Sequence, residues 1–273
     1  VGTLGDMMKI YKREQVPTVD DIWFTGRSNT SYKLVTSAAF NYDRPVALAE
    51  TYAAYQQPTA ESGWRTAMDQ HAMGINEQVG WRPKGAESPE IGQYIGRIEY
   101  LLRGGRHVAD VAVLYPIATR QAEYKFAQPS GVEPVTGGPA RGVDGGFYYA
   151  LEGGIVTPEN TYIDLGEMLF RGMQIDYTYL HPEVLQDNCI IENHQLTINN
   201  KVNRESFKVL ILPGCETISL KTAQKIKEFY LAGGTVIATT VLPKYAAEFG
   251  KDSEVQQIMG EVFGISEYAQ MKP

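Results

Sequence analysis

Apolar residues in the first hundred positions occur either at helical spacing or in short continuous runs. Helical spacing predicts helices at 4–15, 31–42, 65–73 and 89–102. Short apolar runs predict strands at 21–24, 46–49 and 75–79. The continuous run at 46–49 (VALA) is typical of a strand that is covered on both faces of a parallel sheet. This alternation of strands and helices predicts a parallel α/β architecture.

A second set of elements begins near residue 108. Buried strands are predicted at 110–115, 175–180, 207–212 and 235–240, and a hairpin is predicted at 189–200 with its turn near Glu192. Helices are predicted at 158–173, 221–231 and 253–263, and the Gly- and Pro-rich stretch 127–154 is predicted to be a long loop. The order of these elements favours a flavodoxin-like or Rossmann-like three-layer domain. We therefore expect two domains, 1–105 and 106–273.

Composition and charge narrow the class of protein. The chain has 273 residues, of which 43% are hydrophobic and 21% charged, and a formal net charge of −7. An acidic chain without a Lys- or Arg-dense run argues against a nucleic-acid partner or an anionic membrane. No apolar run approaches the roughly 20 residues that cross a bilayer. Because the sequence starts at Val1 rather than Met, we interpret it as an excerpt of a longer protein.

Glu50 is the main candidate for chemistry. It ends the predicted strand at 46–49, and (β/α)₈-barrel enzymes build their active sites at the carboxyl ends of the strands. A carboxylate there, followed by Thr51 and Tyr52, suits stabilisation of an oxocarbenium-like sugar centre or attack on it. The alternative interpretation is an ordinary glutamate in a surface loop.

Three stretches resemble the C-terminal part of large barrel glycoside hydrolases related to the bacterial rhamnosidase and β-galactosidase families. They are 37–52 (SAAFNYDRPVALAETY), 67–79 (AMDQHAMGINEQV) and 92–116 (GQYIGRIEYLLRGGRHVADVAVLYP). The resemblance covers roughly 3 to 263. It implies the last βα units of a (β/α)₈ barrel, followed by an accessory domain of glutamine-amidotransferase-like fold.

The resemblance also implies a site. Glu50 would be the catalytic carboxylate, and the substrate-binding candidates are Tyr52, Asn76, Glu77 and Trp81. The relatives usually carry a His or aromatic residue two to four positions past the strand-eight Asn, whereas Asn76 is followed here by Glu-Gln-Val-Gly-Trp. Trp81 could stack on a sugar ring or be a packing residue. Glu77 could be a second carboxylate or a solvated charge at a strand end.

A barrel glycosidase needs two carboxylates, and the partner of Glu50 is expected on barrel strands that precede this excerpt. The isolated chain is therefore expected to be inactive. Two roles stay open for Glu50, nucleophile or acid/base, and hydrolysis with retention or with inversion of the sugar configuration is compatible with the sequence. The expected partner is a poly- or oligosaccharide substrate. No cofactor and no metal site are predicted, although relatives sometimes use calcium. The resemblance further suggests subunit contacts through the accessory domain and a periplasmic or secreted location.

The two cysteines, Cys189 and Cys215, do not make a disulfide framework, and we expect free, largely buried thiols. Cys215 follows a strand-to-helix sequence (FKVLILPGCET), which allows a weaker alternative, a thiol hydrolase or amidotransferase. The flanking glycines of a Gly-x-Cys-x-Gly elbow are missing and no Cys-His-Glu set is legible. The second domain is therefore interpreted as a degenerate structural module. A non-catalytic accessory or oligomerisation module is also the main alternative for the whole chain.

Overall fold

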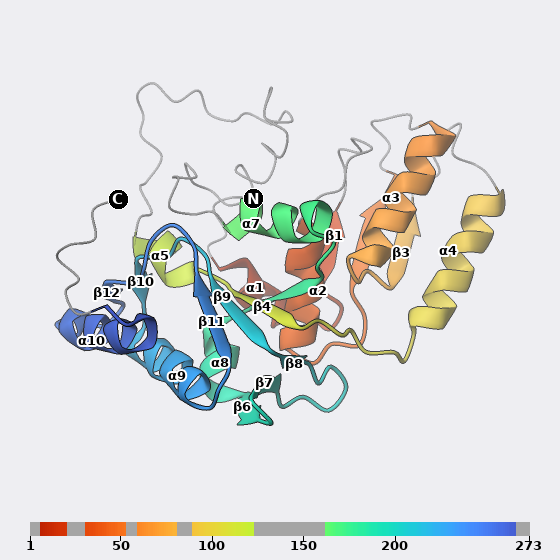
Figure 1. Ribbon diagram of the computed structural model, residues 1–273. Coiled ribbons are helices and arrows are strands. Elements are labelled where there is room, and N and C mark those ends of the chain that lie inside the picture. The colour runs from red at the N-terminus through yellow and green to blue at the C-terminus, as the bar shows by residue number, and fades with distance from the viewer. Residues whose placement is uncertain (1–5, 21–30, 53–58, 81–88, 123–161, 266–273) are drawn as a thin grey trace, which may run out of the picture. The chain divides into compact units, whose positions relative to one another are not determined.

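The computed structural model describes residues 6–20, 31–52, 59–80, 89–122 and 162–265 (Figure 1). It is a mixed α/β structure with two parallel sheets of three and four strands, a parallel pair of short strands, and one antiparallel three-stranded sheet. The prediction of a mixed α/β chain with parallel sheets is confirmed. None of the helices in these ranges has the length and apolarity that a membrane crossing needs.

The chain divides into two compact units that are not continuous in sequence. Unit 2 comprises Met7–Val108 and Asn200–Glu205, and the remaining residues form unit 1. The chain therefore passes between the units four times, after residues 6, 108, 199 and 205.

Unit 2 alternates helices and strands. In chain order these elements are α1 (Met7–Tyr11), β1 (Thr18–Asp20), α2 (Ser31–Asn41), β2 (Leu48–Thr51), α3 (Ala60–Ala72), β3 (Glu77–Gly80) and α4 (Pro89–Leu102). The sheet order β1-β2-β3 follows the chain, and both pairings are parallel. The predicted strand at 21–24 lies outside the described residues. Strand β1 precedes that stretch.

Burial alternates along β2, whereas the sequence predicts cover on both faces. Ala49 and Thr51 are buried, but Leu48 and Glu50 are only half-buried. Successive side chains of a strand point to opposite faces. In the part of the chain that the structure describes, one face of β2 is thus packed and the face that carries Glu50 is more open.

Helix α3 begins five residues before its predicted start at Arg65. Thr59 is the N-cap, and its hydroxyl accepts a hydrogen bond from the backbone N–H of Ser62 at 3.2 Å. The first turn, AESG, has no apolar periodicity, so the cap rather than the hydrophobic pattern sets the start. At the other end Gly74 takes φ of 99°, a conformation suited to glycine, which lets the chain turn into β3.

Residues 200–205 belong to unit 2 although the chain on both sides of them belongs to unit 1. The Asp43 carboxylate accepts three successive backbone N–H groups, those of Lys201, Val202 and Asn203, at 3.1, 3.0 and 2.8 Å. Backbone N–H groups that bond to an ionised carboxylate form strong hydrogen bonds. This contact fixes the segment on the end of α2.

Unit 1 is built around the four-stranded sheet, with strand order β11-β9-β4-β5 and parallel pairing throughout. Its elements are β4 (Val111–Leu114), α5 (Ile117–Ala122), α7 (Tyr162–Glu167), η1 (Met168–Gly172), β5 (Tyr177–Leu180), α8 (Pro182–Asp187), β6 (Cys189–Glu192), β7 (Gln195–Ile198), β8 (Ser206–Phe207), β9 (Val209–Leu212), β10 (Thr217–Ile218), α9 (Leu220–Leu231), β11 (Thr235–Ala238), β12 (Tyr245–Ala246) and α10 (Asp252–Phe263). Helices α9 and α10 pack side by side (Figure 1).

Two local predictions in unit 1 have different outcomes. The hairpin is confirmed: β6 and β7 pair antiparallel, and Asn193 and His194 both take positive φ, 51° and 61°, as a two-residue hairpin turn requires. The single strand predicted at 207–212 is instead divided at Lys208. Phe207 pairs with the hairpin, whereas Val209 onward enters the parallel sheet.

Candidate active site

Two carboxylates lie side by side at the carboxyl ends of β1 and β2. Asp20 and Glu50 are register partners in this parallel pair. Register partners on adjacent strands point to the same face, and their strands lie about 4.8 Å apart. Val79 of β3 continues the row, as the register partner of Glu50 with 52% of its surface exposed. The two carboxylates therefore share the more open face of the sheet.

The Asp20 carboxyl is electrostatically coupled to Glu50. Partial burial raises the pKa of Asp20 above its usual value, and the neighbouring Glu50 carboxylate raises this pKa further. A negative charge nearby disfavours the ionised form of a carboxyl group, so Asp20 holds its proton to higher pH than an isolated aspartate does.

The sequence analysis did not select Asp20 as a catalytic candidate. It lies in the short strand β1, where Val19 is the only large apolar residue, and the predicted strand began one position later. The signal that could have found it is its place at the end of a strand, which is the same feature that selected Glu50.

Tyr52 is buried and turned toward α3. Its hydroxyl donates a hydrogen bond to the Gly63 carbonyl oxygen at 3.1 Å, and its φ is 61°, in the left-handed region. Non-glycine residues adopt this conformation at a cost and often do so at functional sites. The structure places Tyr52 directly after the carboxylate strand, with its ring in the packed layer.

Asn76 and Glu77 lie at the opposite end of β3 from the carboxylate pair. The Asn76 amide accepts from the Ala47 N–H at 2.9 Å and donates to the Pro45 carbonyl oxygen at 2.9 Å. Glu77 opens the strand and forms an ion pair with Arg103. The structure therefore does not bring these two residues together with Glu50. The Asn76 amide binds backbone groups, and the Glu77 carboxylate binds Arg103. Trp81 lies outside the described residues.

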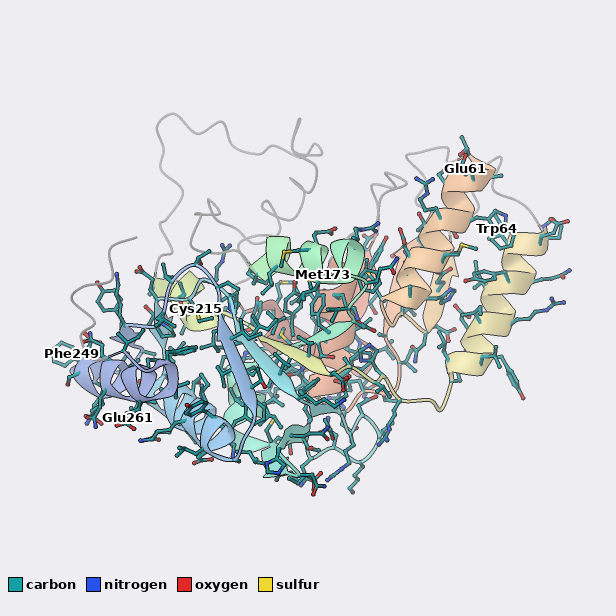
Figure 2. All side chains as sticks on the ribbon, in the orientation of Figure 1. Glu61, Trp64, Met173, Cys215, Phe249 and Glu261 are labelled. Atoms are coloured by element: carbon teal, nitrogen blue, oxygen red, sulfur yellow. The ribbon has the colours of Figure 1, made fainter. Side chains whose placement is uncertain are left out.

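An aromatic cluster joins α3 and α4. Trp64 and His71 of α3 lie 5.2 and 5.8 Å from the Tyr94 ring of α4, measured between ring centroids, and of the three only His71 is buried. Trp64 is labelled on α3 in Figure 2. Burial lowers the pKa of His71 to about 4, so the imidazole is neutral at neutral pH. This histidine packs against Tyr94 between the two helices.

Unit 1 buries its candidate nucleophile. Cys215 has no exposed surface, and burial raises the pKa of its thiol to about 12. The thiolate is the reactive form of cysteine, and this pKa keeps the group protonated at neutral pH. Both cysteines are free and buried, as predicted.

His181, at the end of β5, is already engaged. Its Nδ1 accepts the Glu183 N–H at 3.1 Å and its Nε2 lies 2.9 Å from the Asp6 carboxylate. It is 2% exposed, so its ring is part of the interior of unit 1. In the described ranges, no cluster of three or more His, Cys, Asp or Glu side chains has the arrangement of a metal site.

Comparisons with known proteins give partial structural similarity only. No family model and no curated protein matches the chain. One similar solved structure is Gan42B, a GH42 beta-galactosidase, with a TM-score of 0.48 and 14% identity over 90% of this chain and 36% of that chain. A catalytic mutant of Gan42B from G. stearothermophilus gives a TM-score of 0.45 and 12% identity over 89% of this chain and 35% of that one. The chain thus spans about a third of the length of these glycoside hydrolases, and similarity this low assigns neither a fold nor an activity.

Proposed function

We propose that this chain is part of a glycoside hydrolase that cleaves poly- or oligosaccharides, with Glu50 as one of the two carboxylates of the reaction. The observation that supports this most directly is the place of Glu50, which lies on the more open face at the carboxyl end of a strand in a parallel β/α sheet. Glycoside hydrolysis needs a proton donor and a nucleophile or base, and paired carboxylates supply both.

Two candidates exist for the second carboxylate. Asp20 is the candidate among the described residues, and its raised pKa suits a proton donor. The resemblance instead implies a carboxylate on barrel strands that precede the chain, across the site from Glu50. We favour the preceding strands, because Asp20 and Glu50 are neighbours on one face of adjacent strands, whereas the two carboxyl groups of a glycosidase flank the scissile bond.

We propose that unit 2 is the closing part of a (β/α)₈ barrel. Its three parallel strands follow each other in chain order with a helix after each, which is the repeating unit of that fold. In this proposal the edges of β1 and β3 pair with strands contributed by the rest of the polypeptide.

For unit 1 we propose a structural role in a flavodoxin-like domain of glutamine-amidotransferase-like type. Numbered along the chain, the strands of its main sheet stand in the order 2-1-3-4, which matches the first four strands of the five-stranded flavodoxin-like order. The buried, protonated Cys215 and the engaged His181 argue against a thiol hydrolase there.

The test uses the longer polypeptide that contains this chain, assayed on a panel of aryl glycosides. Glu50→Gln is expected to lower kcat by at least ~10³-fold, about 4 kcal/mol of transition-state stabilisation. Glu77→Gln is the matched control, since it neutralises a carboxylate on the same face at the other end of the strands, and should change kcat less than about threefold. Asp20→Asn separates the two candidates: a loss equal to that of Glu50→Gln makes Asp20 the partner, and a smaller loss leaves it a neighbour.

Two results would contradict the proposal. Full activity in Glu50→Gln would remove Glu50 from the chemistry. A polypeptide that cleaves no glycoside would favour the alternative, a non-catalytic accessory module. The buried Cys215 and His181 of unit 1 are consistent with that alternative.

A further inference from the structure

We propose that Gln70 is a positioning residue that sets the place of the Glu50 carboxylate by joining β2 to β3 on the packed side of the sheet. This role rests on the proposed function, because it takes Glu50 as the reacting carboxylate. The observation behind it is one amide oxygen on α3 that accepts hydrogen bonds from side chains of two adjacent strands.

The first of these bonds comes from Thr51, the residue after Glu50. The Thr51 hydroxyl donates to Gln70 Oε1 at 3.0 Å, a shorter contact than the 3.4 Å to the Ala49 carbonyl oxygen. Neighbouring side chains of a strand point to opposite faces, so Thr51 points toward α3 while Glu50 points to the open face. Fixing Thr51 therefore fixes the rotation of the strand end and with it the direction of Glu50.

The second bond comes from the adjacent strand. Gln78 is the register partner of Ala49, and its Nε2 donates to the same Gln70 oxygen at 2.7 Å. The backbone N–H of Gln78 also donates to the Glu99 carboxylate of α4 at 2.6 Å. One oxygen of Gln70 thus couples β2 to a strand that is itself fixed to the next helix.

Burial makes this link costly to lose. Gln70 and Thr51 have no exposed surface, so water cannot readily replace a missing acceptor. Removing the Gln70 oxygen would leave the Thr51 hydroxyl and the Gln78 amide to find new partners, and the strand ends would shift. The residue after Thr51, Tyr52, is also held to α3, because its hydroxyl donates a hydrogen bond to the Gly63 carbonyl oxygen.

Three substitutions test the link. Gln70→Met removes the acceptor with little change in volume. Thr51→Val removes the matching donor while keeping the branched shape, and it serves if Gln70→Met does not fold. Thr51→Ser keeps the hydroxyl and is the matched control.

The first readout is the pKa of Asp20 in the 273-residue chain, followed by carboxyl ¹³C NMR, because this group senses the charge of Glu50. Glu50→Gln should lower the pKa of Asp20. Gln70→Met and Thr51→Val should move it part of the way in the same direction, and Thr51→Ser should keep the wild-type value. A purely structural Gln70 would lower the unfolding midpoint in both variants and leave the pKa of Asp20 unchanged, and that result would overturn the proposal.

The second readout is activity in the longer polypeptide. Gln70→Met and Thr51→Val should each lower kcat about 10- to 100-fold with KM within about twofold, since misplacement of a reacting group acts on the transition state. Equal losses in kcat for Thr51→Ser and Thr51→Val would count against positioning. Should Glu50→Gln leave both the pKa of Asp20 and kcat unchanged, the proposed function fails first, and that failure is recognised without reference to Gln70.

Discussion

The Glu205 carboxylate contacts the Nδ1 of His107 at 2.5 Å, although 98 residues separate the two in sequence. Both groups are nearly or fully buried in unit 2, and the fully buried Lys33 ammonium lies 3.4 Å from the other ring nitrogen of His107. The Phe40 ring stacks on the imidazole at 4.6 Å between centroids. These contacts join α2, the segment after α4 and residues 200–205 in one buried polar cluster.

Glu205→Leu is expected to destabilise the chain by about 3–5 kcal/mol, because it removes the carboxylate that contacts the buried His107 in a cluster that also contains Lys33. Chemical denaturation measures this change. The control is Asp110→Asn, which breaks the exposed Lys208–Asp110 pair and should cost less than about 1 kcal/mol. Equal effects of the two substitutions would show that the buried cluster does not hold unit 2 together.

Asp43 offers a second test of the same segment. Asp43→Ala should cost about 2–4 kcal/mol, since three backbone N–H groups lose their charged acceptor. Asp43→Asn should cost less than half as much, because the amide oxygen still serves the Val202 and Asn203 N–H groups and asparagine tolerates the φ of 56°. Hydrogen exchange at these two amides reports the local effect: it should accelerate in Asp43→Ala and stay slow in Asp43→Asn. Slow exchange in both variants would contradict the assignment.

Elements with strong local signals could be predicted from the sequence. Helix α4 has the predicted bounds, 89–102, because proline can open a helix and Gly104 with φ of 75° follows its end. Strand β1 was missed, since its three residues TVD carry only one large apolar side chain and the alternation is too short to read. The place of Glu50 at a strand end follows from local pattern alone.

Relationships across the fold could not be read in this way. The Asp20–Glu50 pairing depends on strand register, which arises from packing between segments 30 residues apart. The assignment of residues 200–205 to unit 2 depends on Asp43, a distant side chain that leaves no periodic trace in the sequence. Asn76 was chosen as a substrate-binding candidate by resemblance. The structure shows instead that its side-chain amide forms hydrogen bonds with the backbone of Pro45 and Ala47.

Both thiols should resist modification in the folded chain. Burial raises the pKa of Cys189 and of Cys215 to about 12, so less than one part in a thousand of either thiol is ionised at pH 8. A thiol-reactive disulfide reagent should therefore label neither cysteine at pH 8 and both after denaturation. Rapid labelling of one thiol in the native chain, identified by mass spectrometry, would restore the thiol-hydrolase alternative if that thiol is Cys215.

His71 should make the stability of unit 2 depend on pH. Its pKa is about 4 in the folded chain because burial disfavours the charged ring, whereas an unfolded histidine titrates near 6.5. The unfolded state therefore binds a proton between these values and the folded state does not, so this group lowers stability as the pH falls from about 6.5 to 4. We expect a loss of about 2 kcal/mol across that interval in the wild type, measured by denaturant unfolding at several pH values. His71→Leu, which fills similar space beside Tyr94 without a titrating group, should lose about 2 kcal/mol less over the same range. Identical pH profiles for the two proteins would mean that the folded chain accommodates a charged imidazole between α3 and α4, and that the aromatic cluster there admits water.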